Sequence, residues 1–249
     1  MDIFIIGSGT GFPQFTRGNP GYILVSEGNS ILIDPGPGIM RRMLKFDFNY
    51  QNIDIILITH FHYDHVGGLP EFLFVAANSD IIRDKPLRII GPKGSEEFYG
   101  KLLETYGNQL NADKFGIEFM ELTGGESFKL NDLQVSVIKT VHKDNSVGFG
   151  FTDTKKHKII YLGDTEYSPE FGSFCEKADI LLLEATSLEK KTGHMTPADA
   201  GKIAAEADAK ELILIHISPY QDDNLLLLDC RNSFYGTVKL GKDKTHIIL

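Results

Sequence analysis

The segment Thr59–His65 reads Thr-His-Phe-His-Tyr-Asp-His, which places three imidazoles and one carboxylate together in a chain with eight histidines in all. These groups are the usual nitrogen and oxygen ligands of zinc and related divalent metals. One ion cannot readily bind all four side chains of so short a segment. We therefore expect two ions, with His60 and His62 at one and Asp64 and His65 at the other. Such a site requires a fold that brings further ligands here from distant parts of the chain.

Further residues of ligand type lie just past the ends of apolar, β-branched runs. The run Ile53–Ile58 leads into the histidine-rich segment, and later runs end near His142, Asp164 and His216. Runs of this kind are typical of strands buried on both faces. In layered α/β proteins, active sites gather at the carboxyl ends of strands. A single histidine at a strand end is usually an ordinary core or surface residue, but this recurrence predicts one convergent metal site.

The ligand types divide into two sets that share one carboxylate. The predicted sets are His60, His62 and His142 for one ion, and Asp64, His65 and His216 for the other, with Asp164 as the bridge. Two ions about 3.5–4 Å apart can hold one hydroxide between them as a nucleophile. A structural zinc site is the alternative, but such sites favour closed, cysteine-rich tetrahedra. We expect two divalent ions, with zinc preferred; manganese and iron accept the same ligands.

The alternation of strand and helix patterns predicts the fold class. The predicted strands are Ile3–Ile6, Tyr22–Val25, Ile31–Ile33, Ile53–Ile58, Leu87–Ile90, Val135–Ile138, Val147–Phe151, Ile159–Leu162, Ile180–Leu183 and Leu212–Ile215. The predicted helices are Gly38–Phe46, Leu69–Ala77, Gly94–Tyr106, Thr196–Ala207 and Gln221–Cys230. Strands outnumber helices, which favours an α/β fold with two sheets packed face to face and helices outside. Without a linker-like stretch, residues 1–249 are expected to form a single domain.

Composition narrows the class of protein. The formal net charge of −9 argues against a broad nucleic-acid footprint, which needs a basic face. No apolar run approaches the roughly 20 residues needed to cross a bilayer, and the start lacks the pattern of a signal peptide. Two cysteines, Cys175 and Cys230, do not make a disulfide framework and are expected to be reduced core thiols. These features favour a cytoplasmic enzyme.

The histidine-rich segment, the distant His142, a Gly-Asp-Thr at Asp164 and the final His216 together resemble the metallo-β-lactamase superfamily. The resemblance covers most of the chain. It implies a four-layer αββα sandwich and a dinuclear metal site at one edge of the two sheets. These motifs are specific for the superfamily but say little about the substrate.

Finer motifs are similar to the RNase Z branch. They are Gly7–Pro13, the turn Ile33–Gly36, His65–Pro70, Glu184–Thr186, Gly193–Thr196 and His216–Tyr220. In that branch the histidine equivalent to His194 protonates or stabilises the departing alkoxide, the acid equivalent to Glu184 orients it, and Asp64 takes part in proton transfer from the attacking water. A positioned imidazole suits this chemistry because a phosphodiester has a poor leaving group. Asp34 is expected to tie a turn or to support a ligand rather than to bind metal directly.

The sequence departs from that branch in one respect. Enzymes that process the 3′ end of tRNA usually carry a long basic arm. In many of them this arm lies between the segments equivalent to His142 and Asp164. In this chain those two residues are separated only by Lys143–Gly163, which is enough for two strands and a turn. The predicted function is therefore a dinuclear phosphodiesterase for a small phosphodiester, a cyclic nucleotide or a short oligonucleotide. The alternatives are a tRNA 3′-processing endonuclease, a carboxylic, thioester or sulfate-ester hydrolase, and a non-catalytic metal-binding protein. The branch often dimerises, so the resemblance makes a homodimer possible, but the sequence itself carries no signal of the oligomeric state.

Overall fold

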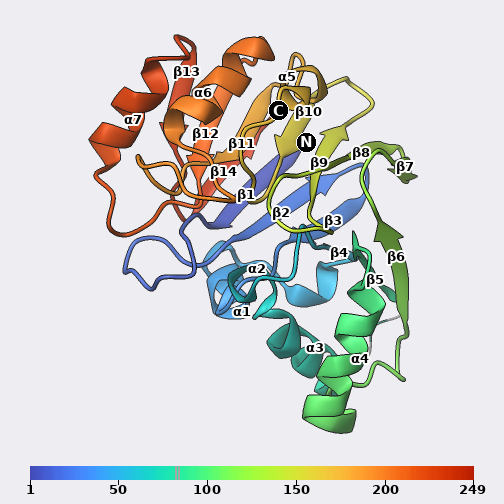
Figure 1. The fold of residues 1–249 in the computed structure, drawn as a ribbon. Helices are drawn as coiled ribbons and strands as arrows, with labels where there is room; N and C mark the ends of the chain where they lie inside the picture. The colour runs from blue at the N-terminus through green and yellow to red at the C-terminus, as the bar shows by residue number, and fades with distance from the viewer. Residues whose placement is uncertain (82, 84) are drawn as a thin grey trace.

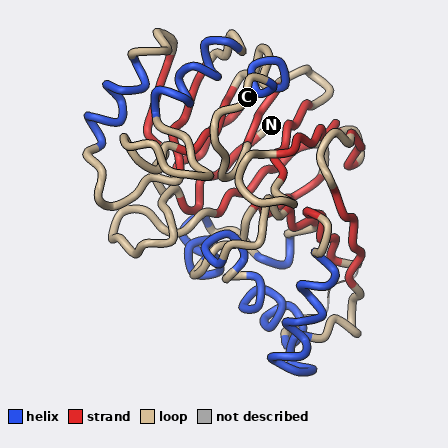
Figure 2. Tube along the Cα trace, in the orientation of Figure 1, coloured by secondary structure: helices blue, strands red, loops and turns tan. Residues whose placement is uncertain are grey.

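Two sheets form the centre of the molecule. The computed structural model describes residues 1–81, 83 and 85–249, and over these residues the chain forms two seven-stranded sheets that pack face to face. Helices cover the outer side of each sheet (Figure 1), and the trace coloured by secondary structure shows the same arrangement (Figure 2). The predicted αββα sandwich is confirmed.

The first sheet carries the amino-terminal half of the chain and its last strand. In spatial order it contains β14 (Thr245–Ile248), β1 (Asp2–Gly7), β2 (Gly21–Ser26), β3 (Asn29–Ile33), β4 (Ile55–Leu57), β5 (Leu87–Pro92) and β6 (Ile117–Leu122). Strands β3 to β6 are parallel, whereas β14, β1, β2 and β3 pair antiparallel. The α-helices of this half are α1 (Ile39–Met43), α2 (Tyr63–Val66), α3 (Leu69–Asn78) and α4 (Ser95–Tyr106), with 3-10 turns η1 (Leu44–Phe46), η2 (Tyr50–Asn52) and η3 (Gly107–Leu110).

The second sheet carries the rest of the chain. Its spatial order is β13 (Thr237–Leu240), β12 (Glu211–Ile215), β11 (Ile180–Glu184), β10 (Lys158–Tyr161), β9 (Val147–Thr152), β8 (Leu133–Lys139) and β7 (Ser127–Leu130). Strands β10 to β13 are parallel and β7 to β10 antiparallel. The helices are α5 (Glu170–Phe174), α6 (Pro197–Glu206) and α7 (Asp223–Arg231).

The central strands are apolar on both faces because each face packs against a different layer. In β10, Ile159 and Tyr161 belong to the core between the sheets. The alternate residues Ile160 and Leu162 belong to the core that also contains Ile203 of α6. Since side chains alternate across a strand, a continuous apolar run is what this double burial requires. The residue that follows such a run lies at the end of the strand, where the neighbouring parallel strands of the sheet also end.

All five predicted helices are present within two or three residues of their expected bounds. Thr196 caps α6: its hydroxyl accepts from the Asp199 N–H while the Asp199 carboxylate accepts from the Thr196 N–H, a capping box. The predicted pairings of β2 with β3 and of β8 with β9 are confirmed, and between His142 and Asp164 lie β9, β10 and their connecting turn. The sequence reading missed β6, β7, β13, β14, α2 and α5.

Cys175 and Cys230 are free and buried, as expected. Across the described parts of the chain, no helix has the length and apolarity needed to span a membrane.

Candidate metal centre

The predicted ligands meet where parallel strands of both sheets end. His60 follows β4 of the first sheet, whereas Asp164 and His216 follow β10 and β12 of the second. An isolated parallel bridge between Gly9 and Ile217 joins the two sheets at this edge. The carboxyl ends of parallel strands lie on the same side of a sheet, so strand order alone brings these side chains together.

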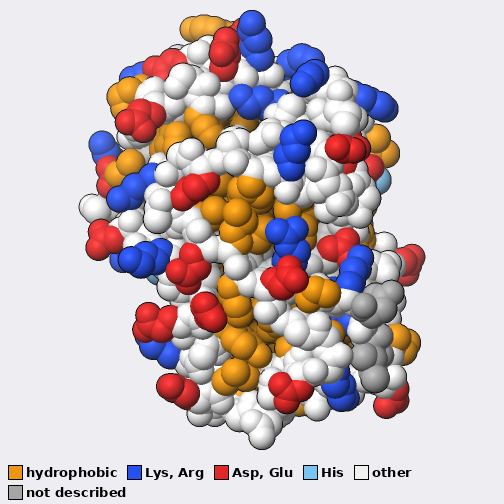
Figure 3. Space-filling model, turned by 90° about the vertical axis from the view of Figure 1, so that its right-hand side faces the viewer, with side chains coloured by type: hydrophobic (Ala, Val, Ile, Leu, Met, Phe, Trp, Pro, Cys, Tyr) orange, Lys and Arg blue, Asp and Glu red, His pale blue; other side chains and the backbone are white. Residues whose placement is uncertain are grey.

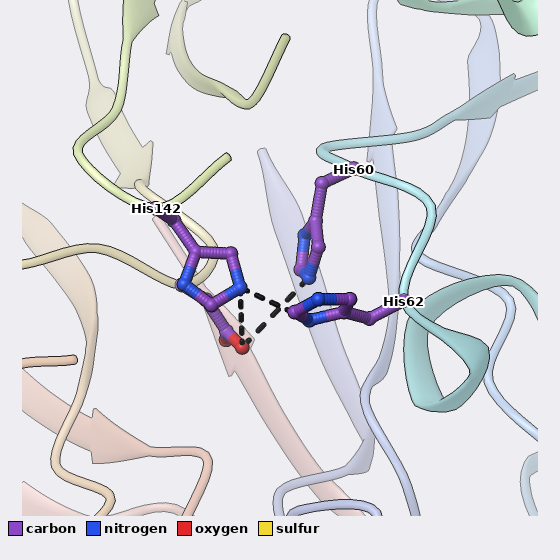
Figure 4. Close-up of side chains that lie close together, drawn as sticks. His60, His62 and His142 are labelled. Atoms are coloured by element: carbon purple, nitrogen blue, oxygen red, sulfur yellow. Dashed lines mark hydrogen bonds and ion pairs between the residues drawn. The ribbon is translucent and has the colours of Figure 1, made fainter. Parts of the chain in front are cut away.

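The first donor group contains His60, His62 and His142, whose rings point toward one another in Figure 4. His142 Nε2 lies 3.0 Å from His62 Nδ1. The Nε2 atoms of His60 and His142 are each 3.8 Å from Asp164 Oδ2. One oxygen of Asp164 therefore faces the rings of His60 and His142 at distances that leave room for an ion, and His62 completes the group beside His142.

The second donor group contains Asp64, His65 and His216. His216 Nε2 lies 3.3 Å from Asp64 Oδ2, and His65 Nε2 lies 3.9 Å from the same oxygen. The other oxygen of Asp164, Oδ1, is 3.3 Å from His65 Nε2 and 3.6 Å from His216 Nε2. The two carboxylate oxygens of Asp164 thus face different donor groups, which is the arrangement that a bridging ligand needs.

Buried polar atoms in this cluster have no hydrogen-bond partner. His60 Nε2, His65 Nε2 and Asp164 Oδ1 are buried and form no hydrogen bond within the described residues. An unpaired buried polar group is costly, so native structures nearly always satisfy it with a protein group, water or an ion. All three atoms are of the types that divalent metals bind, and they face one another. The residues present therefore fit a divalent metal site.

The electrostatics of the cluster favour added positive charge. Burial lowers the pKa of His60 well below its ordinary value, lowers that of His62, and brings that of His142 to about 4. These three imidazoles are neutral near pH 7, and a neutral imidazole is the form that ligates metal. At His65 burial is outweighed by the Asp164 and Asp34 carboxylates, which raise its pKa well above the ordinary value. The acidic groups thus attract a cation, which a metal ion supplies.

Asp34 supports the site from the end of β3. Its fully buried carboxylate accepts from the Thr59 N–H and hydroxyl, both at 2.8 Å, from Tyr161 Oη at 2.6 Å and from His65 Nδ1 at 2.8 Å. The bond to His65 leaves Nε2 of that ring directed at Asp164. The Thr59 hydroxyl also lies 3.0 Å from His60 Nδ1. Asp34 therefore orients His65 directly and His60 through Thr59, in line with the supporting role expected for it.

Glu184 makes a matching arrangement at the end of β11. It is fully buried, accepts from the Thr186 hydroxyl at 2.5 Å and lies 3.0 Å from His194 Nδ1. The Thr186 hydroxyl is also 2.8 Å from His216 Nδ1. Glu184 thus orients His194 directly and His216 through a threonine, as Asp34 does for its own pair. Burial raises the pKa of Glu184, and at His194 the hydrogen bond and charge of Glu184 outweigh burial and raise the imidazole pKa.

No role was predicted for the hydroxyls of the two threonines, although both residues belong to the motifs quoted above. Thr59 precedes a predicted ligand directly, and Thr186 lies two residues after Glu184, so it shares a face with that residue in an extended strand. These spacings were the available signals. His194 also stands close to the metal cluster, with Nδ1 3.9 Å from Asp164 Oδ2.

Replacing Asp34 by asparagine is expected to lower the free energy of unfolding by about 3 kcal/mol, because a buried, multiply bonded carboxylate becomes a neutral amide that cannot accept all four bonds. Asparagine also tolerates the positive φ of 48° at this position, so the backbone is not strained by the change. Urea unfolding measures the difference. Asp54→Asn is the control, since half-buried Asp54 accepts one backbone N–H and pairs with exposed Lys85; a loss under about 1 kcal/mol is expected there. Equal losses in the two variants would contradict the supporting role.

The fold and the donor groups define a metal-dependent hydrolase of the metallo-β-lactamase type. A family model described as "Beta-lactamase superfamily domain" matches residues 29–217. The chain belongs to this superfamily, and relatives named ribonuclease Z are among the proteins that it resembles.

Two relatives and two solved structures illustrate the likeness. "Ribonuclease Z" of Metallosphaera sedula is 29% identical over 94% of this chain and 94% of its own length. "Probable metallo-hydrolase YhfI" of Bacillus subtilis is 26% identical over 97% of each. The crystal structure of YhfI superposes with a TM-score of 0.86 at 24% identity, covering 99% of this chain and 98% of that one. The structure of human tRNase Z, short form, has a TM-score of 0.81 at 28% identity, covering 100% and 99%.

Proposed function

We propose that this protein is a phosphodiesterase that works with two divalent ions, zinc by preference, on a small phosphodiester, a cyclic nucleotide or a short oligonucleotide. The observation that carries the proposal is the position of Asp164, whose two oxygens face two separate donor groups. Histidine and carboxylate are ligands common to zinc, manganese and iron. His60, His62 and His142 would hold one ion, and Asp64, His65 and His216 the other, with Asp164 shared. A homodimer and a cytoplasmic location stay predictions.

Two such ions, when bound, supply Lewis acidity and lower the pKa of water toward neutrality. The remaining chemistry is assigned to side chains of the protein. His194 Nδ1 is held by Glu184, so Nε2 is the nitrogen free to donate a proton to the departing oxygen. The raised pKa of His194 favours the protonated form that this step needs. Asp64 is assigned to accept a proton from the attacking water. Burial raises the pKa of Asp64, but the hydrogen bond with His216 and the charges of His65 and His216 together outweigh burial and lower that pKa, which favours the ionised carboxylate.

A second candidate is tRNA 3′ processing, which the names of the ribonuclease Z relatives favour. The alignment with the Metallosphaera sedula protein spans 285 positions, more than the 249 residues of this chain, so that relative holds segments that this chain lacks. The alignment with YhfI spans 256. On the face drawn in Figure 3, basic and acidic side chains are interspersed, in keeping with the acidic net charge of −9. The segments that this chain lacks favour the smaller substrates.

The proposed function is tested by supplying zinc or manganese to protein stripped of metal by a chelator. We expect turnover of bis-p-nitrophenyl phosphate and of at least one cyclic nucleotide, with the stripped protein retaining under about 1% of the rate, since metal activation supplies several kcal/mol. A thioester, a lactone and a precursor tRNA complete the panel. Good turnover of the thioester or lactone without any phosphodiester cleavage would sink the proposal, and preference for precursor tRNA would favour the second candidate.

A further inference from the structure

The metal centre opens into a cavity of about 440 Å³, which is in the range typical of small-ligand sites. Asp64, Asp164 and His194 line its inner part, while Phe12 and Lys191 also contribute to the lining. A cavity of this size suits a compact ligand with one reacting phosphate. It does not enclose a nucleic-acid duplex.

Two large aromatic rings are exposed beside this cavity. Phe12 is 57% exposed and lines the cavity, and Tyr220 is 77% exposed and contacts Phe12 with ring centroids 5.7 Å apart and planes at 67°. The loop that carries Phe12 lies against the metal centre, since a methyl group built on Gly11 would come within 3.3 Å of the Asp64 carboxylate. Adjacent exposed rings beside a concave polar site are typical of a binding surface.

The loops that carry these rings are tied to each other. The Ile217 N–H donates to the Ser8 carbonyl at 3.1 Å, and Gln14 Nε2 donates to the Ile217 carbonyl at 3.1 Å. Buried Arg17 pairs with Asp223 at the start of α7 at 2.7 Å. These contacts between protein groups hold the two loops together. The aromatic pair is therefore preorganised, which lowers the entropy lost on binding.

One lysine side chain also lines the cavity. Lys191 is exposed, lines the same cavity, and forms no ion pair within the described ranges. The charged groups lining the inner cavity are otherwise the acidic Asp64 and Asp164 and the imidazoles. An available ammonium at such a position suits an anionic ligand.

Resting on the proposed phosphodiesterase function, we infer that the substrate is a nucleotide phosphodiester whose base packs against the Phe12–Tyr220 pair, stacked on one ring and touching the edge of the other, while Lys191 meets the charge of the phosphate. Stacking of a base on an aromatic side chain is tolerant of base identity because every base has a π face. The aromatic pair therefore selects for a nucleoside as such, without selecting one base.

The test uses two substrates with the same leaving group, thymidine 5′-p-nitrophenyl phosphate and methyl p-nitrophenyl phosphate, on zinc-loaded protein. We expect kcat/KM to be at least about tenfold higher for the nucleoside substrate. Phe12→Ala and Tyr220→Ala should each raise KM for that substrate about tenfold and change the methyl substrate less than twofold. Tyr220→Phe, which keeps the ring, should behave as the unaltered protein.

Phe15→Ala is the matched control, because this ring belongs to the same loop and is fully exposed but does not line the cavity. It should leave both substrates unchanged. Equal kcat/KM for the two substrates, or equal losses on both in the Phe12 and Tyr220 variants, would overturn the inference. A changed oligomeric state in those variants, with unchanged selectivity, would overturn it in favour of a surface covered by a second copy. Turnover of neither substrate would overturn the proposed function itself, and the inference with it.

Discussion

Asp164→Ala is expected to leave the protein with at least one metal ion fewer per chain and to lower kcat/KM on a phosphodiester by on the order of 10³-fold. Both donor groups depend on this side chain, since Oδ2 faces His60 and His142 while Oδ1 faces His65 and His216. Alanine removes two ligand oxygens and the buried negative charge that balances the cations. Elemental analysis after dialysis against metal-free buffer measures the ion content directly.

The control for this experiment is Asp179→Ala. Asp179 directly precedes β11, at the end of the parallel strands opposite to the metal centre, where it accepts from the Lys158 N–H and pairs with Lys210. Its loss affects stability through a partly exposed ion pair but leaves the metal centre untouched, so two ions should remain. Two ions retained in Asp164→Ala as well would contradict the bridging role, and circular dichroism establishes that both variants are folded.

The interior of the fold could be predicted from the sequence because a strand that is buried on both faces appears there as a continuous apolar run. Strands such as β11 and β12, covered on both faces, are uninterrupted apolar runs. The missed strands lie at or near sheet edges, where exposed and buried positions mix polar and apolar residues: β6, β7, β13 and β14. Helix α2 has four residues, and two of them are Asp64 and His65, so no helical periodicity could reveal it.

The side chains of the metal centre also differ in whether the sequence could predict their roles. The metal ligands could be predicted because histidine and aspartate are common ligand types and because these residues follow predicted strands. The orienting hydroxyls of Thr59 and Thr186 could not, because threonine is common and each hydroxyl has a partner at the end of a neighbouring strand, Asp34 for Thr59 and His216 for Thr186. These two pairings depend on which strands the fold sets side by side, so they emerge only in three dimensions. Each buried carboxylate orients two imidazoles, and this shared design relates the two halves of the site.

His194→Ala is expected to lower kcat by about 10²- to 10⁴-fold on a substrate with an alkoxide leaving group, such as a cyclic nucleotide. On p-nitrophenyl esters the same variant should lose less than about tenfold, since p-nitrophenolate departs without a proton. The reason is geometric: Glu184 holds His194 Nδ1 at 3.0 Å, and Nε2 is left to protonate the departing oxygen. Steady-state rates on both substrate types, with metal content measured on the same samples, make the comparison.

Metal content decides between two roles for this residue, because His194 also stands with Asp164 and His216 in a group whose donor atoms could hold an ion. Loss of metal in His194→Ala, with equal loss of rate on both leaving groups, would make His194 a ligand and contradict its role as the acid. Glu184→Gln refines the test, since an amide still holds the imidazole in place but no longer stabilises its protonated form. That variant should lose rate on the alkoxide substrate, retain it on the p-nitrophenyl ester, and keep both ions.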